Sequence, residues 1–464
     1  MNISIFVSML FCLQFFYWLV GRRASKNLKG KEDYFLAGKS VRLFPLMMTF
    51  LATQVGGGVI LGAADEAYQF GWPVLLYPMG AALGLILLGS GIGRKLAGFQ
   101  VSTVAQIFEV AYGSVRLRKI ASALSVISLF MILVAQIIAS NKFLVSLGFS
   151  NIPLFILFWS IVIIYTAQGG LRAVISTDMV QAAFFSSIFL LCFGFVLFFE
   201  PTISLMQIPH LESFANVSSK LCGWLLMPLL FMVIEQDMGQ RCFAGASPRI
   251  VSRASFLAGV CTMTICIVPV FFGSLANVTG LEVSQGSSVL MAMIAKTTNP
   301  WITALVGCAV LAAIISTATS LINAISSNLS SDFKLSFLQN VDSMKVVKGI
   351  TCIIAIGAIF FAFYFDNIVD LLIQSYELSV SCLFVPVIMA LFKRKGNFIS
   401  ACTAIILGAI GFVLFRIYPI DFPKEILSLL LSMLGYGVGE VVDLWATSGN
   451  RRNRRDSLPF QIHR

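Results

Sequence analysis

The stretch Ala52-Thr53-Gln54-Val55-Gly56-Gly57-Gly58 lies inside an otherwise apolar run over residues 43–68. Three successive glycines remove side-chain packing and let a helix unwind locally. Unwound backbone at membrane depth is tolerated where it is buried in protein or lines a cavity. The stretch therefore predicts a span that is broken near its centre. The alternative is an unbroken helix that crosses a neighbour closely through its small residues.

Apolar runs of similar length recur along the whole chain. Of the 464 residues, 58% are hydrophobic and 11% charged, and the mean hydropathy is +0.91, whereas soluble domains carry about 25% charged residues. Because a helix needs about 20 apolar residues to span a bilayer, we expect an all-α polytopic membrane protein with about thirteen transmembrane helices. The expected spans are 3–20, 43–68, 72–97, 119–145, 152–168, 174–199, 222–243, 251–275, 300–328, 347–365, 368–391, 397–417 and 426–446.

The net charge of +11 has a topological explanation. With the N-terminus outside, 27 of the 32 basic residues fall in inside loops or the tail, as expected for a membrane protein. We therefore expect a multi-pass protein of the inner (plasma) membrane with a cytoplasmic C-terminus, and no nucleic-acid partner. We expect one transmembrane domain over residues 1–450 and a basic tail over 451–464. The five basic residues expected outside are Lys142, Lys220, Lys296, Arg416 and Lys424.

A second interruption is expected in the seventh span. Pro228 is followed by the polar run Glu235-Gln236-Asp237-Met238-Gly239-Gln240-Arg241. Broken helices at matching positions of two halves are typical of transporters built from inverted repeats, in which the broken helices line the transport site. The alternatives are an interfacial charge cluster and, for Asp237 and Arg241, a pair on one helix face.

Polar residues recur along the ninth span. Ser316, Ser320, Asn323 and Ser327 are spaced by four, three and four residues, so they share one helix face. Hydroxyls and free carbonyls can bind a sodium ion, although such residues also serve helix packing.

Asp178 is a second candidate in the membrane. A carboxylate at membrane depth is costly, and this favours a functional role; the alternative is a helix cap.

Other site chemistries find little support in the sequence. The ten cysteines contain no CxxC pair, and the two histidines fall in a loop and in the tail. No nucleophile with a base, no metal quartet and no phosphate-binding loop is present. We therefore expect no enzyme, no transition metal and no organic cofactor.

Five segments together resemble the sodium/solute symporters, the group of proline, pantothenate and sugar carriers. They are residues 21–40, residues 103–113, the Gly-Gly turn with Thr-Asp and Gln over residues 169–181, residues 236–241, and residues 313–332. The resemblance implies a LeuT-like core of two inverted five-helix repeats, at about 43–199 and 222–391. The extra helices would be 3–20, 397–417 and 426–446.

The resemblance also implies site residues. Sodium would be bound by Ala52, Val55, Ala313, Ser316 and Thr317, with Asp178 near the inner exit. The solute would lie beside Gln54, Gly56, Gly57, Gly58, Pro228, Phe231, Met232 and Glu235, with Gln374 and Glu377 as further candidates. The apolar face of the seventh span departs from the pattern of sugar carriers, which offers Asn, Tyr and Trp there.

The expected function is sodium-coupled import of a small polar organic solute, of the amino-acid, organic-acid or vitamin class, by alternating access. Na+ is the expected co-transported ion, and the lipid bilayer and the solute are the expected partners, with no obligatory protein partner. Two alternatives stay open: a proton-coupled carrier using Asp178 or Glu377, and a transporter-like sensor.

Overall fold

The chain folds into a bundle of helices. The computed structural model describes residues 3–26, 30–148, 152–199, 218–284, 286–333, 343–393, 396–418, 420 and 422–456. Within these residues no strand forms, and ten helices are long and apolar enough to cross a membrane, or up to twelve if each bent pair is one span. The all-α polytopic class is confirmed.

The helices follow one another along the chain. In order they are α1 (Ile3–Ala24), α2 (Gly30–Leu36), η1 (Ala37–Lys39), α3 (Leu43–Gln54), η2 (Gly58–Gly62), α4 (Ala63–Phe70), η3 (Trp72–Leu75), α5 (Leu76–Leu87), η4 (Leu88–Ile92), α6 (Gly93–Ala97), α7 (Gln106–Tyr112), α8 (Val115–Ser146), α9 (Ile152–Phe199), α11 (Ser218–Ile234), α12 (Gln236–Ala244), α13 (Pro248–Val278), α14 (Val289–Thr297), α15 (Pro300–Asp332), α16 (Ser343–Phe361), η6 (Ala362–Tyr364), α17 (Ile368–Ser379), η7 (Val380–Phe384), α18 (Val385–Lys393), α19 (Phe398–Ile417) and α20 (Lys424–Asp456).

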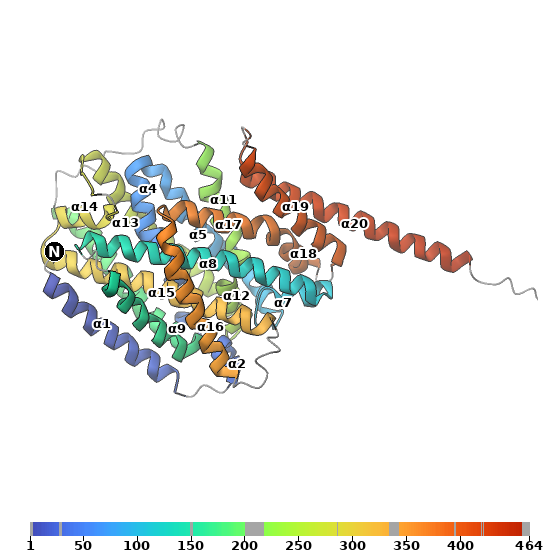
Figure 1. Ribbon diagram of the computed structural model, residues 1–464, viewed down its shortest axis with the longest axis horizontal. Helices are drawn as coiled ribbons and strands as arrows, with labels where there is room; N and C mark the ends of the chain where they lie inside the picture. Colours follow the sequence, from blue (N-terminus) through green and yellow to red (C-terminus); the bar gives the residue numbers. More distant parts are fainter. Residues whose placement is uncertain are drawn as a thin grey trace, which may run out of the picture.

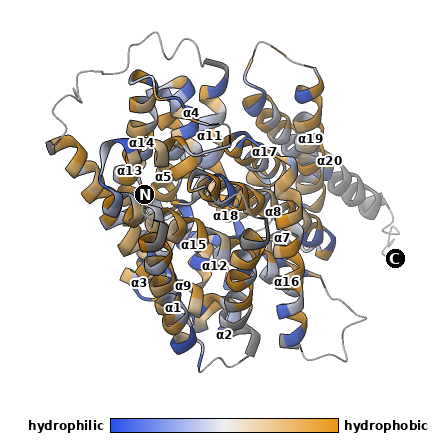
Figure 2. Ribbon diagram, turned by 60° about the vertical axis from the view of Figure 1, so that its left-hand side comes forward, coloured by the Kyte–Doolittle hydropathy of each residue, from blue (hydrophilic) through white to orange (hydrophobic). Residues whose placement is uncertain are grey.

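Helix α15 forms the centre of the bundle. Of its most apolar window, 94% is buried inside the protein, against 11% for α1. It packs against α8, α9, α3 and α12, while α19 and α20 pack on each other at one side (Figure 1). Figure 2 shows apolar residues over most of the helices and hydrophilic ones toward the two opposite ends of the bundle. The predicted polar stripe of the ninth span therefore faces protein, not lipid.

Both predicted helix breaks are present. Helix α3 ends at Gln54 and the chain bends by 52° before η2 and α4, and α11 and α12 meet at Glu235 with a bend of 44°. Because Glu235 is extended, with φ −62° and ψ 126°, the helical hydrogen-bond ladder is interrupted there.

The three glycines at the first break also allow close packing. Cβ atoms built on Gly56, Gly57 and Gly58 would lie 2.5, 2.4 and 2.3 Å from Thr317, Ala139 and Leu372. Close helix crossing, which we considered as an alternative to a break, thus accompanies it.

The count of thirteen spans is not confirmed. The two spans expected at 152–168 and 174–199 both lie within α9, in which two helices meet at a kink at Gly170 (φ 58°, ψ −169°). The part after the kink is long enough to cross a membrane (Gly169–Phe198), whereas the described apolar stretch before it, Phe155–Ile164, is shorter than a span. The last helix is longer than expected, because α20 continues to Asp456.

Replacing Gly170 by alanine should destabilise the protein strongly. Its φ of 58° disfavours a side chain by roughly 1–2 kcal/mol, and the added Cβ would lie 2.6 Å from the carbonyl oxygen of Tyr34. Gly194→Ala, also in α9, is the matched control, since no atom of the described residues lies within 4 Å of its Cβ position. Thermal unfolding of the two purified variants should show a much lower midpoint for Gly170→Ala alone. Equal midpoints would mean that the kink does not depend on glycine.

Candidate functional site

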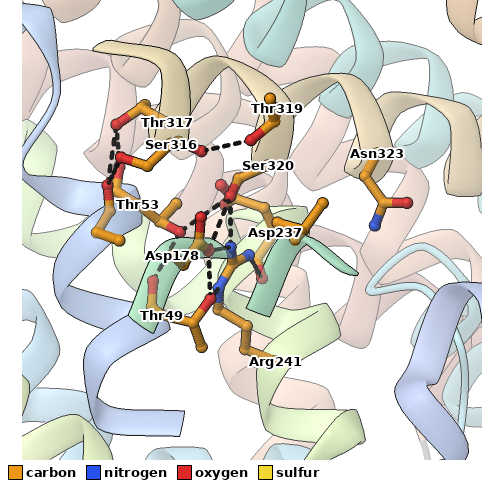
Figure 3. Close-up of polar contacts among 12 residues, drawn as sticks. Thr49, Thr53, Asp178, Asp237, Arg241, Ser316, Thr317, Thr319, Ser320 and Asn323 are labelled. Carbon is orange, nitrogen blue, oxygen red and sulfur yellow. Dashed lines mark hydrogen bonds and ion pairs between the residues drawn. The ribbon is translucent and has the colours of Figure 1, made fainter. Parts of the chain in front are cut away.

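Two hydroxyls of α15 meet free carbonyls at the end of α3 (Figure 3). The Ser316 hydroxyl donates to the carbonyl oxygens of Ala52 at 3.0 Å and Ala313 at 2.9 Å. The Thr317 hydroxyl lies 3.1 Å from the carbonyl oxygens of Ala52 and Thr53, and 3.2 Å from that of Ala313. The cluster is buried and built entirely from neutral oxygens. Such a donor set suits a hard monovalent cation.

The structure brings four of the predicted sodium residues together, namely Ala52, Ala313, Ser316 and Thr317. Val55 directly follows α3 as its C-cap, and its N–H donates to the Leu51 carbonyl at 3.0 Å. Among the described hydrogen bonds, the third carbonyl on these hydroxyls belongs to Thr53, not to Val55. Sequence alone could not select Thr53, because every residue at a break offers a carbonyl.

Asp178 lies at the centre of a second polar cluster. Its Oδ2 accepts hydrogen bonds from Thr49 at 2.6 Å, Arg241 at 3.2 Å and Ser320 at 3.4 Å. The side chains of Asp178 and Arg241 are fully buried. Thr53 joins this cluster to the first one, since its hydroxyl donates to Ser320 at 3.3 Å.

Neither structural alternative for the acidic residues holds. Asp178 lies well inside α9, eight residues beyond the Gly170 kink, and does not cap a helix. The guanidinium of Arg241 reaches Asp178 with its Nη2, and its Nη1 donates to the backbone carbonyl of Asp237, at 3.0 Å, not to that residue's carboxylate among the described hydrogen bonds. The charge of Asp178 is therefore balanced from another helix, and its role toward sodium stays a prediction.

The two helix breaks are joined by side chains. Gln54 Nε2 donates to Glu235 Oε2 at 3.1 Å, and the Gly57 N–H donates to Gln136 Oε1 at 2.7 Å. The rings of Phe231 and Tyr376 stack with their centroids 4.7 Å apart. These groups form a candidate solute site with one carboxylate, two amides and an aromatic wall.

Two further predicted solute residues on α11 point elsewhere. Pro228 and Met232 are one turn apart and pack on α5, where they contact Gly80 and Gly84. Phe231 and Glu235 form the neighbouring stripe and face the break. Helical periodicity thus divides the predicted set into a packing half and a site half.

Gln374 and Glu377 are also separated from the break. On α17 the stripe Ile368, Val369 and Leu372 contacts Gly58 and Gly62 of η2, and Tyr376 continues it. Gln374 and Glu377 lie on another face and line a different cavity.

The site also contains residues that the sequence analysis missed: Thr49, Thr53, Gln136 and Tyr376. Thr49 and Thr53 are four residues apart and so share a helix face, and Gln136 is a lone polar residue within an apolar run. These signals were present in the sequence, but their partners lie on other helices.

Solved structures of other proteins share this fold. A sodium-coupled sialic acid symporter, solved in a substrate-bound outward-open state, superposes with a TM-score of 0.75 over 94% of this chain and 97% of that one, at 19% identity. Mhp1, a nucleobase-cation-symport-1 family transporter in a closed conformation, gives 0.58 over 87% of this chain and 93% of its own, at 15% identity. At such identities the likeness establishes the fold, which is that of LeuT-like transporters.

Relatives by sequence are also transporters. The sodium/pantothenate symporter of Haemophilus influenzae is 23% identical over 99% of both chains. The high-affinity choline transporter 1 of Drosophila melanogaster is 24% identical over 84% of this chain, but the match spans only 66% of that relative's length. Sodium/glucose cotransporter 4 of Danio rerio is 30% identical over 34% of this chain and 24% of its own.

The sequence resemblance is confirmed by the family comparison. The protein-family model described as "Sodium:solute symporter family" matches residues 34–408 of this chain. This range includes both helix breaks and the hydroxyls of α15. The matching proteins are transporters and not enzymes. Because the match covers most of the sequence, the chain belongs to the sodium:solute symporter family.

Proposed function

We propose that this sodium-coupled symporter imports a small polar organic solute of the amino-acid, organic-acid or vitamin class. The observation that carries the proposal is the contact of the Ser316 and Thr317 hydroxyls with the Ala52 and Ala313 carbonyls. A sodium ion at this point would join α3 to α15 and replace the hydroxyl–carbonyl hydrogen bonds by ion–oxygen contacts.

Sodium binding at the break would couple to the solute through α3. Gln54 directly follows Thr53, whose carbonyl is part of the ion cluster, and it donates to Glu235 at the other break. An ion that fixes the end of α3 therefore also fixes one wall of the solute site. One charge crossing 100 mV supplies about 2.3 kcal/mol, enough for roughly fiftyfold accumulation.

Within the three solute classes, the site favours a molecule with an amine. Glu235 is buried beside stacked aromatic rings, and a carboxylate with an aromatic wall attracts ammonium groups. The choline transporter among the relatives has a cationic substrate by its name, which agrees with this preference. A sugar offers no charge to Glu235.

The proposed orientation has the N-terminus outside and the C-terminus in the cytoplasm. Four of the five basic residues expected outside gather at one end of the bundle. Lys142 pairs with Asp65 at 3.1 Å and Lys220 with the adjacent Glu66 at 3.6 Å, and Lys220, Arg416 and Lys424 line one cavity. This common location supports their assignment to the same side.

Uptake by the reconstituted protein tests the proposal. Proteoliposomes should accumulate at least one labelled amino acid, organic acid or vitamin when an inward sodium gradient is imposed, and not when sodium is equal on both sides. A proton-coupled carrier would instead respond to a pH gradient without sodium, and a sensor would accumulate nothing under either gradient. Protein-free liposomes are the control for leakage.

A further inference from the structure

A second polar cavity lies apart from the helix breaks. It has a volume of about 870 Å³ and is enclosed by the start of α11, α17, the end of α19 and the start of α20. Its charged lining includes Lys220, Asp370, Glu377, Arg416, Lys424 and Glu425. In the proposed orientation it opens at the outer end of the protein. Its volume is within the range of about 300–1,000 Å³ typical of small-molecule sites.

One ion pair at the cavity is incompletely satisfied. Arg416 Nη2 donates to Glu377 Oε2 at 2.8 Å, and the Glu377 side chain is only 1% exposed. Among the described residues, neither Glu377 Oε1 nor Arg416 Nη1 has a hydrogen-bond partner, although both atoms are buried. Burying a polar group without a partner costs about 1–3 kcal/mol, so an interaction that only held α17 to α19 would be expected to satisfy both atoms.

Glu425 adds a second open acceptor to the same cavity. Its side chain packs over Gly223 of α11, where a Cβ would lie 2.9 Å from Oε1. Its Oε2 is buried and has no partner in the described part of the chain. Two carboxylate oxygens and one guanidinium nitrogen of residues that line the cavity are therefore buried with their hydrogen-bonding capacity unused among the described residues.

The charges of these unpartnered groups indicate which kind of ligand the cavity could bind. A metal cation is disfavoured, because Lys220, Arg416 and Lys424 line the same cavity. A simple anion is disfavoured by the carboxylates of Glu377 and Glu425. A small molecule with N–H donors at one end and a carboxylate at the other matches both kinds of open group.

We propose that this cavity is an outer binding site for a small zwitterion with a free ammonium group and a carboxylate, as in an α-amino acid. On binding, small rotations of these side chains turn Glu377 Oε1 and Glu425 Oε2 toward the ammonium and Arg416 Nη1 toward the carboxylate. The site is distinct from the one at the helix breaks, because Glu377 lies on the face of α17 that points away from Gly58. This second site goes beyond the proposed function, since a ligand would bind to it without sodium.

Equilibrium binding in sodium-free buffer tests the outer site. The full-length protein in lipid nanodiscs is titrated with tritiated glycine, alanine, proline and glutamine. At least one should bind saturably, and its N-acetyl and carboxamide derivatives should compete at least about tenfold more weakly, because a charged hydrogen bond contributes about 1.5–3 kcal/mol. Glu425→Gln should lower the affinity about tenfold or more. Glu440→Gln, which alters an exposed pair with Lys393 at the middle of α20, should not.

Three results would overturn the outer site: no saturable binding by any of the four probes, equal competition by the blocked derivatives, or unchanged affinity in Glu425→Gln. The double variant Ser316→Ala/Thr317→Ala separates this proposal from sodium-coupled transport. It should lose sodium-driven uptake and keep sodium-free binding. If it loses the sodium-free binding while Glu425→Gln keeps it, the probe occupies the central site and the outer site is refuted.

Discussion

The double substitution of Ser316 and Thr317 by alanine is expected to raise the sodium concentration for half-maximal uptake about a hundredfold. Both hydroxyls converge on the carbonyls of Ala52 and Ala313, so the variant removes two of the oxygens available to the ion. An interaction with a charged group contributes about 1.5–3 kcal/mol, and about 1.4 kcal/mol corresponds to a tenfold change in affinity. Initial uptake rates measured against sodium concentration give the result directly.

Ser326→Ala is the matched control for this experiment. Ser326 is a buried serine of the same helix, but its hydroxyl donates to Ile322 and contacts Thr351 of α16, away from the break. Uptake by Ser326→Ala should depend on sodium as uptake by the wild type does. The wild type, Ser326→Ala and the double variant should all rank the solutes in the same order. A double variant with unaltered sodium dependence would remove the two hydroxyls from the ion site.

The sequence was sufficient to predict the parts of the site that follow from local chemistry. Glycines at residues 56–58 and the polar run after Ile234 mark places where a helix cannot continue regularly, and both breaks are present. Ser316 and Ser320 share a helix face by spacing alone, and the structure places both toward α3. These features depend on neighbours in the chain, so a single sequence contains them.

Contacts between distant helices could not be predicted in the same way. Asp178 was a candidate, but Arg241 was considered only as a partner of Asp237, which lies at a helical spacing of four. The pair with Asp178 forms because α9 and α12 both approach α3, where Thr49 bonds to both side chains. The same limitation explains why Gln136 was missed, since its partner is a backbone N–H of another helix.

The sequence also could not predict which neighbouring helix each face of a helix contacts. Pro228 and Phe231 are both apolar and three residues apart, but one packs on α5 and the other on Tyr376. None of the large apolar residues of α17 is exposed, so no exposed apolar stripe reveals which side faces the break. Only the packing of neighbouring helices assigns Gln374 and Glu377 to the outer cavity.

Substitution of Asp178 by asparagine should destabilise the protein by about 3–5 kcal/mol, because breaking a fully buried ion pair leaves an uncompensated charge. Arg241 would keep its hydrogen bonds to Thr49 at 3.0 Å and to Ser320 at 2.6 Å but would lose its counter-charge. Denaturant unfolding of the purified protein in detergent should show this loss. Glu440→Gln is the control, since an exposed pair contributes about 0–1 kcal/mol.

A double variant distinguishes the structural effect of the pair from an effect on transport. Asp178→Asn/Arg241→Gln removes both charges, so it should recover most of the stability lost by Asp178→Asn. If Asp178 also acts on the ion, sodium-driven uptake by the double variant should stay far below that of the wild type although the protein is folded. Recovery of both stability and uptake would make the pair purely structural. A single variant Asp178→Asn as stable as the wild type would contradict the ion pair itself.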